Sequence, residues 1–246
     1  MPSTCQYYSL DELDELEDEA AKAEPQHQMA ALEIVARIFH DAELPYALMG
    51  GMNFFLRGSG RTTDDIDVLV GGNQSLEATL NLLNEDPRIT RPKDKMIWLS
   101  GVARVFVLED GQQVQVDLKW QRAEGRGMPL DLTASAEPLQ VTGSGVVIHF
   151  LAIGPLVKTK FQAYCNRDEE RDYLDLLFVC NHPEYRHQVR AVANQINESG
   201  RAEFLAEVMG RNTGFKDIVR AVRWALRLDD DSGGSEREEE GSFGRF

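Results

Sequence analysis

Three aspartates stand at the entrance of an apolar run in the segment GSGRTTDDIDVLVGG, residues 58–72. A charge at the mouth of a buried strand is costly unless another group pairs with it. Strand side chains alternate between two faces, so Asp65 and Asp67 share one face and Asp64 points the other way. Two carboxylates on one face repel each other unless they share a cation, and hard oxygen ligands favour Mg²⁺ or Mn²⁺. The alternative is an ordinary acidic turn in solvent, and for Asp64 we expect a solvated or arginine-paired side chain.

A third acid, Asp117, lies in the apolar segment VQVDLKW, residues 114–120. If its strand lies beside the strand of Asp65 and Asp67, three carboxylates meet at one place. Such a set holds two metal ions about 3.5–4 Å apart, an arrangement that serves in-line phosphoryl displacement. The alternative is an acid at a sheet edge that neighbouring groups satisfy.

Gly50 and Gly51 lie between a predicted strand and a predicted helix, shortly before the aspartates. Glycine allows a ligand to approach the backbone closely, and the free N–H groups of a helix N-terminus favour phosphate. A Gly-Gly turn is common by itself, but its combination with a following D-x-D pair is much rarer. Together they predict a phosphate-binding turn beside metal-binding carboxylates.

Apolar spacing and turn residues predict the elements that must position these groups. We expect strands at 46–49, 64–72 and 145–151, and a hairpin over 103–120 with its turn at Asp110-Gly111. We expect helices from the Gly-Gly turn to Gly58 or Gly60, and at 29–40, 75–84, 155–166, 170–181, 189–209 and 215–228. Ser9 and Glu12 fit a capping box for a short surface helix with a stripe of Leu10, Leu13 and Leu16. A partner-binding helix is the alternative there.

The net charge of −15 is concentrated at the two ends of the chain. Residues 1–24 carry −7 and residues 229–246 carry −5, whereas the other 204 residues carry only −3. The body can therefore still hold an anion-binding cleft. The predicted fold class is α+β, with an acidic N-terminal segment at 1–24, a mixed-sheet α/β core at 25–151, a helical domain at 152–228 and a disordered acidic tail at 229–246.

The composition argues against several classes of protein. The three cysteines have no C-x-x-C spacing and the five histidines are scattered, so neither a disulfide framework nor a zinc site is expected. There is no apolar run of membrane-spanning length and no secretory signal pattern at the start. We therefore expect a cytoplasmic protein that does not associate with a membrane.

The motif MGG…RTTDDIDVLV resembles the signature of the nucleotidyltransferase superfamily with a DNA polymerase β-like fold. Its form R-x-T-x-D-I-D, here Arg61, Thr63, Asp65, Ile66 and Asp67, resembles the branch of AbiEii-type toxins and related minimal nucleotidyltransferases. Asp117 falls where that fold supplies its third carboxylate. Many members have Gly-Ser where this chain has Gly50-Gly51, which leaves backbone N–H groups to bind the γ-phosphate.

The later segment KFQAYCNRDEERDYLDL resembles the same branch's K-h-x-A-x-x-x-R stretch followed by R-D-x-x-D-L. The matching positions are Lys160, Ala163, Arg167, Arg171, Asp172, Asp175 and Leu176. Lys160 and Arg167 lie seven residues apart on one helical face and can present two cations to a triphosphate. The alternative is a solvated helix face with ordinary Arg–Asp pairs.

The resemblance implies a metal-dependent nucleotidyltransferase that moves a nucleoside monophosphate from an NTP such as ATP to an acceptor hydroxyl, with release of pyrophosphate. It implies Mg²⁺ or Mn²⁺ as the cofactor, and an acceptor that is tRNA, another RNA or a small hydroxylated molecule. The implied catalytic and metal-binding residues are Asp65, Asp67 and Asp117. The implied nucleotide-binding residues are Gly50, Gly51, Arg61, Lys160 and Arg167. The alternative is a catalytically idle member that serves as a binding or scaffold protein.

Overall fold

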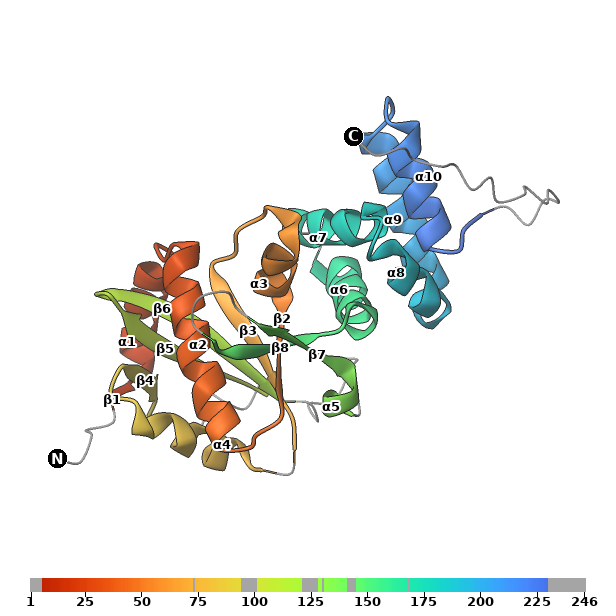
Figure 1. Cartoon of the computed structure of the whole chain (residues 1–246). Coiled ribbons are helices and arrows are strands. Elements are labelled where there is room, and N and C mark those ends of the chain that lie inside the picture. Colours follow the sequence, from red (N-terminus) through yellow and green to blue (C-terminus); the bar gives the residue numbers. More distant parts are fainter. Residues whose placement is uncertain are drawn as a thin grey trace, which may run out of the picture.

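The computed structural model describes residues 6–72, 74–93, 101–120, 128–129, 131–140, 145–167 and 169–229. Within them an eight-stranded mixed sheet is followed by a group of helices, which confirms the α+β class (Figure 1). The strand order is β1-β4-β5-β6-β3-β2-β8-β7. The strands are β1 Gln6–Tyr8, β2 Tyr46–Met49, β3 Asp65–Val70, β4 Ile89–Pro92, β5 Val102–Glu109, β6 Gln112–Trp120, β7 Ala136–Gln140 and β8 Val147–Leu151. The predicted tail lies outside the described residues from position 230 onward.

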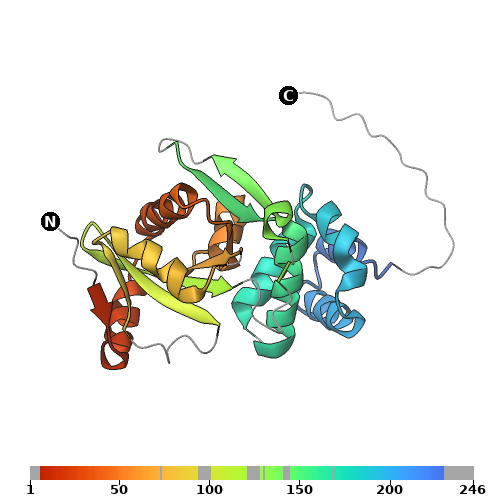
Figure 2. The same cartoon turned by 90° about the horizontal axis from the view of Figure 1, so that it is seen from below.

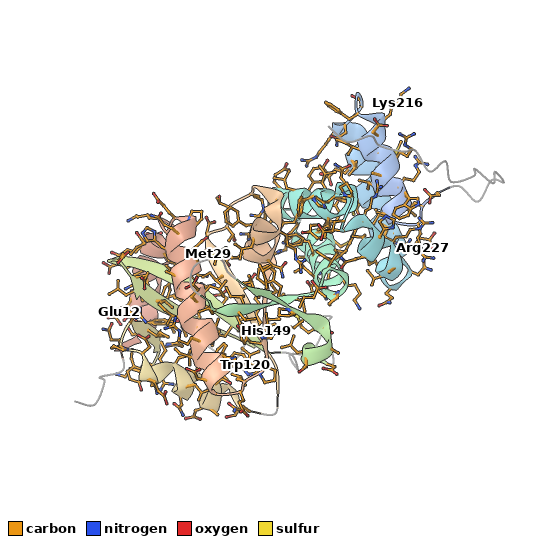
Figure 3. All side chains as sticks on the ribbon, in the orientation of Figure 1. Glu12, Met29, Trp120, His149, Lys216 and Arg227 are labelled. Carbon is orange, nitrogen blue, oxygen red and sulfur yellow. The ribbon has the colours of Figure 1, made fainter. Side chains whose placement is uncertain are left out.

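The helices form two groups, one in the sheet part and one in the helical part that follows it. The first group is α1 Leu10–Ala20, α2 Pro25–Asp41, α3 Gly50–Phe54 with a π-helical continuation η1 Phe55–Ser59, α4 Leu76–Leu82 with η2 Leu83–Glu85, and α5 Leu132–Ser135. The second group is α6 Ile153–Arg167, α7 Glu170–Asn181, α8 Arg186–Val192 with η4 Ala193–Gln195, α9 Glu198–Arg211 and α10 Lys216–Ala225. In Figure 3, Lys216 and Arg227 mark the far end of the helical part, opposite Glu12 and Met29 in the sheet part. None of the helices described here combines the length and the apolar character that a bilayer span needs.

The predicted hairpin is present and sets the register of the central strands. Asp110 and Gly111 both have positive φ, 49° and 81°, as a two-residue turn between right-twisted strands requires. This turn pairs β5 with β6 so that Arg104 lies opposite Asp117. On its other side β6 runs parallel to β3 and places Asp117 opposite Asp67.

The two faces of the sheet carry different side chains. One face buries Ile66, Val68 and the alternate apolar residues of β5 and β6 against α2, in a core that includes Leu32 and Phe39. The opposite face carries Asp65, Asp67 and Asp117, and we call it the carboxylate face. Figure 2 shows α1 and α2 on opposite sides of the sheet.

The carboxylate face is covered at its two ends by different parts of the chain. At one end Leu13 and Leu16 of α1 pack with Tyr8 and Phe106. At the other end Leu69 of β3 belongs to the same core as the apolar side chains of α6 and α7. The carboxylates lie between these two covers.

Several predicted elements need correction. A single helix over 189–209 is wrong, because the chain is extended at Ile196 and Asn197 then caps α9 through a hydrogen bond from the Ser199 N–H. The strands β1, β4 and β7 were not predicted, since they are short and depend on pairing with distant partners. The capping box of α1 is confirmed, but Leu10 is exposed and does not join Leu13 and Leu16 in the core.

Candidate active site

The turn between β2 and α3 brings the backbone directly against one of the predicted metal ligands. Gly50 has a φ of 64°, in the left-handed region that glycine adopts without strain. A Cβ atom on Gly50 would lie 2.0 Å from Oδ2 of Asp67. Any side chain at this position would therefore displace the Asp67 carboxylate.

Gly51 leaves room for the loop that precedes β3. A Cβ atom on Gly51 would lie 2.6 Å from Oγ1 of Thr63 and 2.8 Å from Nη2 of Arg61. The Thr63 hydroxyl in turn donates a hydrogen bond of 3.0 Å to Oδ1 of Asp65. The second glycine and the R-x-T motif are thus parts of one packed unit that orients Asp65.

The three predicted carboxylates meet on the carboxylate face. Asp65 and Asp67 are two residues apart in β3, and Asp117 lies opposite Asp67 in the parallel strand β6. One oxygen from each of them lies within 4.8 Å of the others. We call these three residues the carboxylate cluster.

The cluster concentrates negative charge in a partly buried place. Burial, followed by the charges of Asp67 and Asp117, raises the pKa of Asp65 to about 6. The ammonium group of Lys119 contacts the Asp67 carboxylate and offsets part of this charge. A site that raises the pKa of a carboxyl and attracts a lysine is one that favours a cation.

Asp117 is the most constrained member of the cluster. The Arg104 guanidinium donates hydrogen bonds of 2.8 and 3.0 Å to its two oxygens, and Gln115 donates another of 3.1 Å. Arg104 also contacts Glu17 of α1. The hydrogen bond to Asp117 and the charges of both acids raise the pKa of Arg104 above its usual range.

The helical part supplies a second set of ion pairs on the other side of the cluster. Lys160 of α6 lies 2.9 Å from a carboxylate oxygen of each of two fully buried acids of α7, Asp172 and Asp175. Arg61 binds Asp175 with hydrogen bonds of 2.9 and 2.8 Å, and Arg167 binds Asp172 at 2.9 Å. We call these five residues the helical-side network.

A cleft of about 290 Å³ opens between the cluster and α6. Its lining includes Gly50, Asp67, Lys119, Lys160 and Arg167. The cleft therefore has the Asp67 carboxylate, paired with Lys119, on its sheet side, and the cationic side chains of Lys160 and Arg167 on its α6 side. Such a distribution suits a ligand that carries both phosphate groups and bound metal ions.

The eight residues predicted from the sequence lie in or around this cleft, but in two different situations. Asp67, Gly50, Lys160 and Arg167 line it, and Asp65 and Asp117 complete the cluster beside Asp67. Gly51 instead packs against Thr63 and Arg61, and the guanidinium of Arg61 is bound by Asp175. Asp64 precedes β3 and is exposed, in agreement with the solvated side chain that the sequence predicted.

Sequence reasoning missed Lys119, Arg104 and Glu17. Lys119 stands two residues after Asp117 in a strand, so alternation alone places both on one face. A two-residue turn at Asp110-Gly111 fixes the hairpin register, so the position of Arg104 opposite Asp117 also followed from the sequence. Glu17 carried no such signal, because its position depends on how α1 packs on the sheet.

Comparison with solved structures places the fold. An antigenic nucleotidyltransferase-like protein from Paracoccidioides brasiliensis aligns with a TM-score of 0.51 at 12% identity, over 80% of this chain and 94% of that one. JHP933 from Helicobacter pylori aligns with a TM-score of 0.46 at 15% identity, over 84% and 93% of the two chains. The antibiotic-resistance factor ANT(2'')-Ia aligns with a TM-score of 0.39 at 12% identity, over 77% and 96%. No protein-family model and no curated protein matches the sequence.

The first of these similarities confirms the fold that the sequence motifs indicated. The chain has the nucleotidyltransferase fold, with a mixed sheet followed by a helical part. At 12% identity the similarity shows the fold and leaves the chemistry to the residues of the site.

Proposed function

We propose that the protein is a metal-dependent nucleotidyltransferase that moves a nucleoside monophosphate from an NTP to an acceptor hydroxyl and releases pyrophosphate. The carboxylate cluster, which reaches through Asp67 into a cleft with Lys160 and Arg167 on its far side, is the observation that carries this proposal. The nucleotidyltransferase fold supports it.

The donor set fits a hard divalent cation. All three candidate ligands are carboxylates, and their oxygens lie within 4.8 Å of one another. Oxygen-only sites of this kind suit Mg²⁺ or Mn²⁺ better than zinc. Asp65, Asp67 and Asp117 would hold the metal, which when bound neutralises phosphate charge during the transfer.

The transfer itself forms one P–O bond and breaks another. The acceptor oxygen attacks the α-phosphorus, the bond from that phosphorus to the β-phosphate oxygen breaks, and pyrophosphate leaves with the electron pair. The proton of the acceptor hydroxyl passes to a carboxylate oxygen of Asp117. In this proposal Gly50, Lys160 and Arg167 hold the triphosphate, while Arg61 and Gly51 keep the phosphate-binding turn in place.

The decisive experiment is incubation of the protein with each α-labelled NTP, Mg²⁺ or Mn²⁺, and either total RNA or a panel of aminoglycosides. We expect label to appear on one acceptor class with one pyrophosphate released per transfer. Mass spectrometry of the labelled fraction then identifies the acceptor as RNA, tRNA in particular, or as a small hydroxylated molecule. The absence of transfer, together with no thermal shift for any NTP and metal, would support an idle scaffold protein instead.

A matched pair of variants ties the activity to the cluster. Asp67→Ala should abolish transfer, because it removes a metal ligand at the wall of the cleft. Asp64→Ala changes the same residue type three positions away, at an exposed site, and should retain activity. Circular dichroism should show both variants folded, and full NTP turnover by Asp67→Ala would refute the mechanism.

A further inference from the structure

Arg104 links the carboxylate cluster to the acidic N-terminal segment. Its guanidinium donates two hydrogen bonds to Asp117, and it contacts the carboxylate of Glu17 as well. The Asp117 side chain is only 8% exposed, whereas those of Arg104 and Glu17 are 29% and 35% exposed. One guanidinium thus connects a nearly buried candidate metal ligand with an acid near the protein surface.

The fold holds Glu17 in this place through several independent contacts. The ring of Tyr8 packs edge-on against Phe106 with centroids 5.4 Å apart, and its hydroxyl donates a 2.9 Å hydrogen bond to the Arg104 carbonyl. Gln112 of β6 donates to the Glu19 carbonyl at the end of α1. Because α1 is fixed to β5 and β6, the contact between Glu17 and Arg104 is a built feature of the tertiary structure.

A partly exposed ion pair contributes little to stability by itself. This pair lies beside the carboxylate cluster, so its effect is on the geometry and the charge of that cluster. A bidentate arginine fixes the plane of the carboxylate that it binds, and so decides which Asp117 oxygen faces Asp65 and Asp67. The same guanidinium brings a positive charge next to a site that must attract a cation, and Glu17 offsets that charge.

We propose that Glu17 is a positioning residue that acts through Arg104 to orient Asp117 and to neutralise the guanidinium beside the metal site. This inference rests on the proposed metal-dependent function. It gives the acidic N-terminal segment a task within the site itself.

The test measures binding of Mn²⁺ alone to the full-length protein by isothermal titration calorimetry. Glu17→Gln keeps the shape of the side chain and removes its charge. We expect its Kd for Mn²⁺ to rise roughly ten-fold, the lower end of the loss caused by removing a direct partner of a metal ligand, because Glu17 acts one contact further out, through Arg104. The matched control Glu15→Gln makes the same change on the same helix at an exposed residue and should leave the Kd within about two-fold of wild type.

A double-mutant cycle tests whether Glu17 acts through Arg104. Arg104→Met removes both the fork that binds Asp117 and the charge that Glu17 offsets. In that background Glu17→Gln should raise the Kd by much less than ten-fold, because the two residues act in series. Melting temperatures, recorded for all four proteins, identify any loss that is due to unfolding.

The outcomes separate this inference from the proposed function. If wild-type protein binds no Mn²⁺, the proposed metal-dependent function fails and the inference fails with it. If wild-type protein binds Mn²⁺ and Glu17→Gln matches Glu15→Gln, only the inference is overturned. Fully additive effects of Glu17→Gln and Arg104→Met would also overturn it, since they would show independent actions.

Discussion

The two sides of the carboxylate cluster use ion pairs in opposite ways. On the N-terminal side one cation, Arg104, is shared by two acids, Glu17 and Asp117, and all three have some exposure. On the helical side the network has three cations, Arg61, Lys160 and Arg167, around two acids that are fully buried. The first set therefore has an excess of negative charge and the second an excess of positive charge.

This difference in charge makes the two sides of the site electrostatically unequal. In the proposed function, this difference favours a metal ion toward the N-terminal side and phosphate groups toward the helical side, and so would orient a nucleotide with its metal. The difference in burial has a second consequence. Buried partners are costly to separate, so the helical-side network ties the helices to the sheet, whereas the N-terminal pair adjusts one carboxylate at little cost in stability.

The largest expected effect is on the helical side. Asp175→Asn leaves Arg61 and Lys160 without a shared counter-charge in a buried place and should reduce the free energy of unfolding by about 3–5 kcal/mol. Urea denaturation measures this loss. Asp217→Asn breaks an exposed pair with Arg220 and should change stability by less than about 1 kcal/mol. Equal losses in the two variants would show that the helical-side network is no stronger than a surface pair.

A smaller loss of stability is expected at the turn before α3, where Gly51 packs against Arg61 of the helical-side network. Gly51→Ala pushes a Cβ atom against Thr63 and Arg61 and should destabilise the protein by about 1–3 kcal/mol. Gly210→Ala is the control, because a Cβ atom there meets nothing within 4 Å and helix propensity should stabilise the protein by about 0.5–1 kcal/mol. Thermal unfolding of both variants shows whether each substitution raises or lowers stability. A stabilising Gly51→Ala would contradict the close packing of this turn.

The carboxylate cluster should make metal binding depend on pH, because Asp65 holds a proton up to a pH of about 6. The pKa of Asp65 is raised from 3.8 to about 6, so the folded metal-free protein holds this proton at pH values where the unfolded chain has lost it. Its contribution to stability therefore falls as the pH rises from about 4 to 6. Mn²⁺ must displace the proton, so its affinity should fall by up to about ten-fold for each pH unit below 6 and level off above pH 7. Calorimetric titrations between pH 5 and pH 8 test this, and a constant Kd over that range would contradict it.

The smallest effect is expected at the anchor of the N-terminal side. Tyr8→Phe removes the hydrogen bond to the Arg104 carbonyl but keeps the packing on Phe106, so it should cost about 1 kcal/mol. The neighbouring Tyr7 is exposed, and its hydroxyl accepts a hydrogen bond from Arg91 at the surface. Tyr7→Phe should therefore change stability by less than about 0.5 kcal/mol. Chemical denaturation of both variants tests whether the anchor is stronger than a surface contact.

The parts of the site that follow from local rules could be predicted from the sequence. Strand alternation placed Asp65 and Asp67 on one face, and the turn at Asp110-Gly111 predicted the hairpin that carries Asp117. Pairing of β6 with β3 was a condition in that reasoning, and the structure satisfies it.

The parts that depend on tertiary packing could not be predicted. Nothing near Glu17 in the sequence indicates that it meets Arg104, because β1 and α1 are placed by contacts with residues about 90 positions away. The family resemblance implied Lys160 and Arg61 as nucleotide-binding residues, and in the structure both form ion pairs with Asp175. A buried acid on α7 decides their positions, and burial of Asp172 and Asp175 could not be read from a segment rich in charged residues.

The parallel pairing of β1 with β4 also bears on the order in which the protein folds during synthesis. Residues 6–8 find their partners only after residues 90–92 have been made, and Arg61 finds Asp175 later still. Contacts so distant in sequence form slowly because closing long loops costs entropy before any contact is gained. A ribosome-bound fragment that ends before α7 therefore contains every residue that lines the cleft. It lacks Asp172 and Asp175, the two acids that hold Arg61, Lys160 and Arg167 in their places.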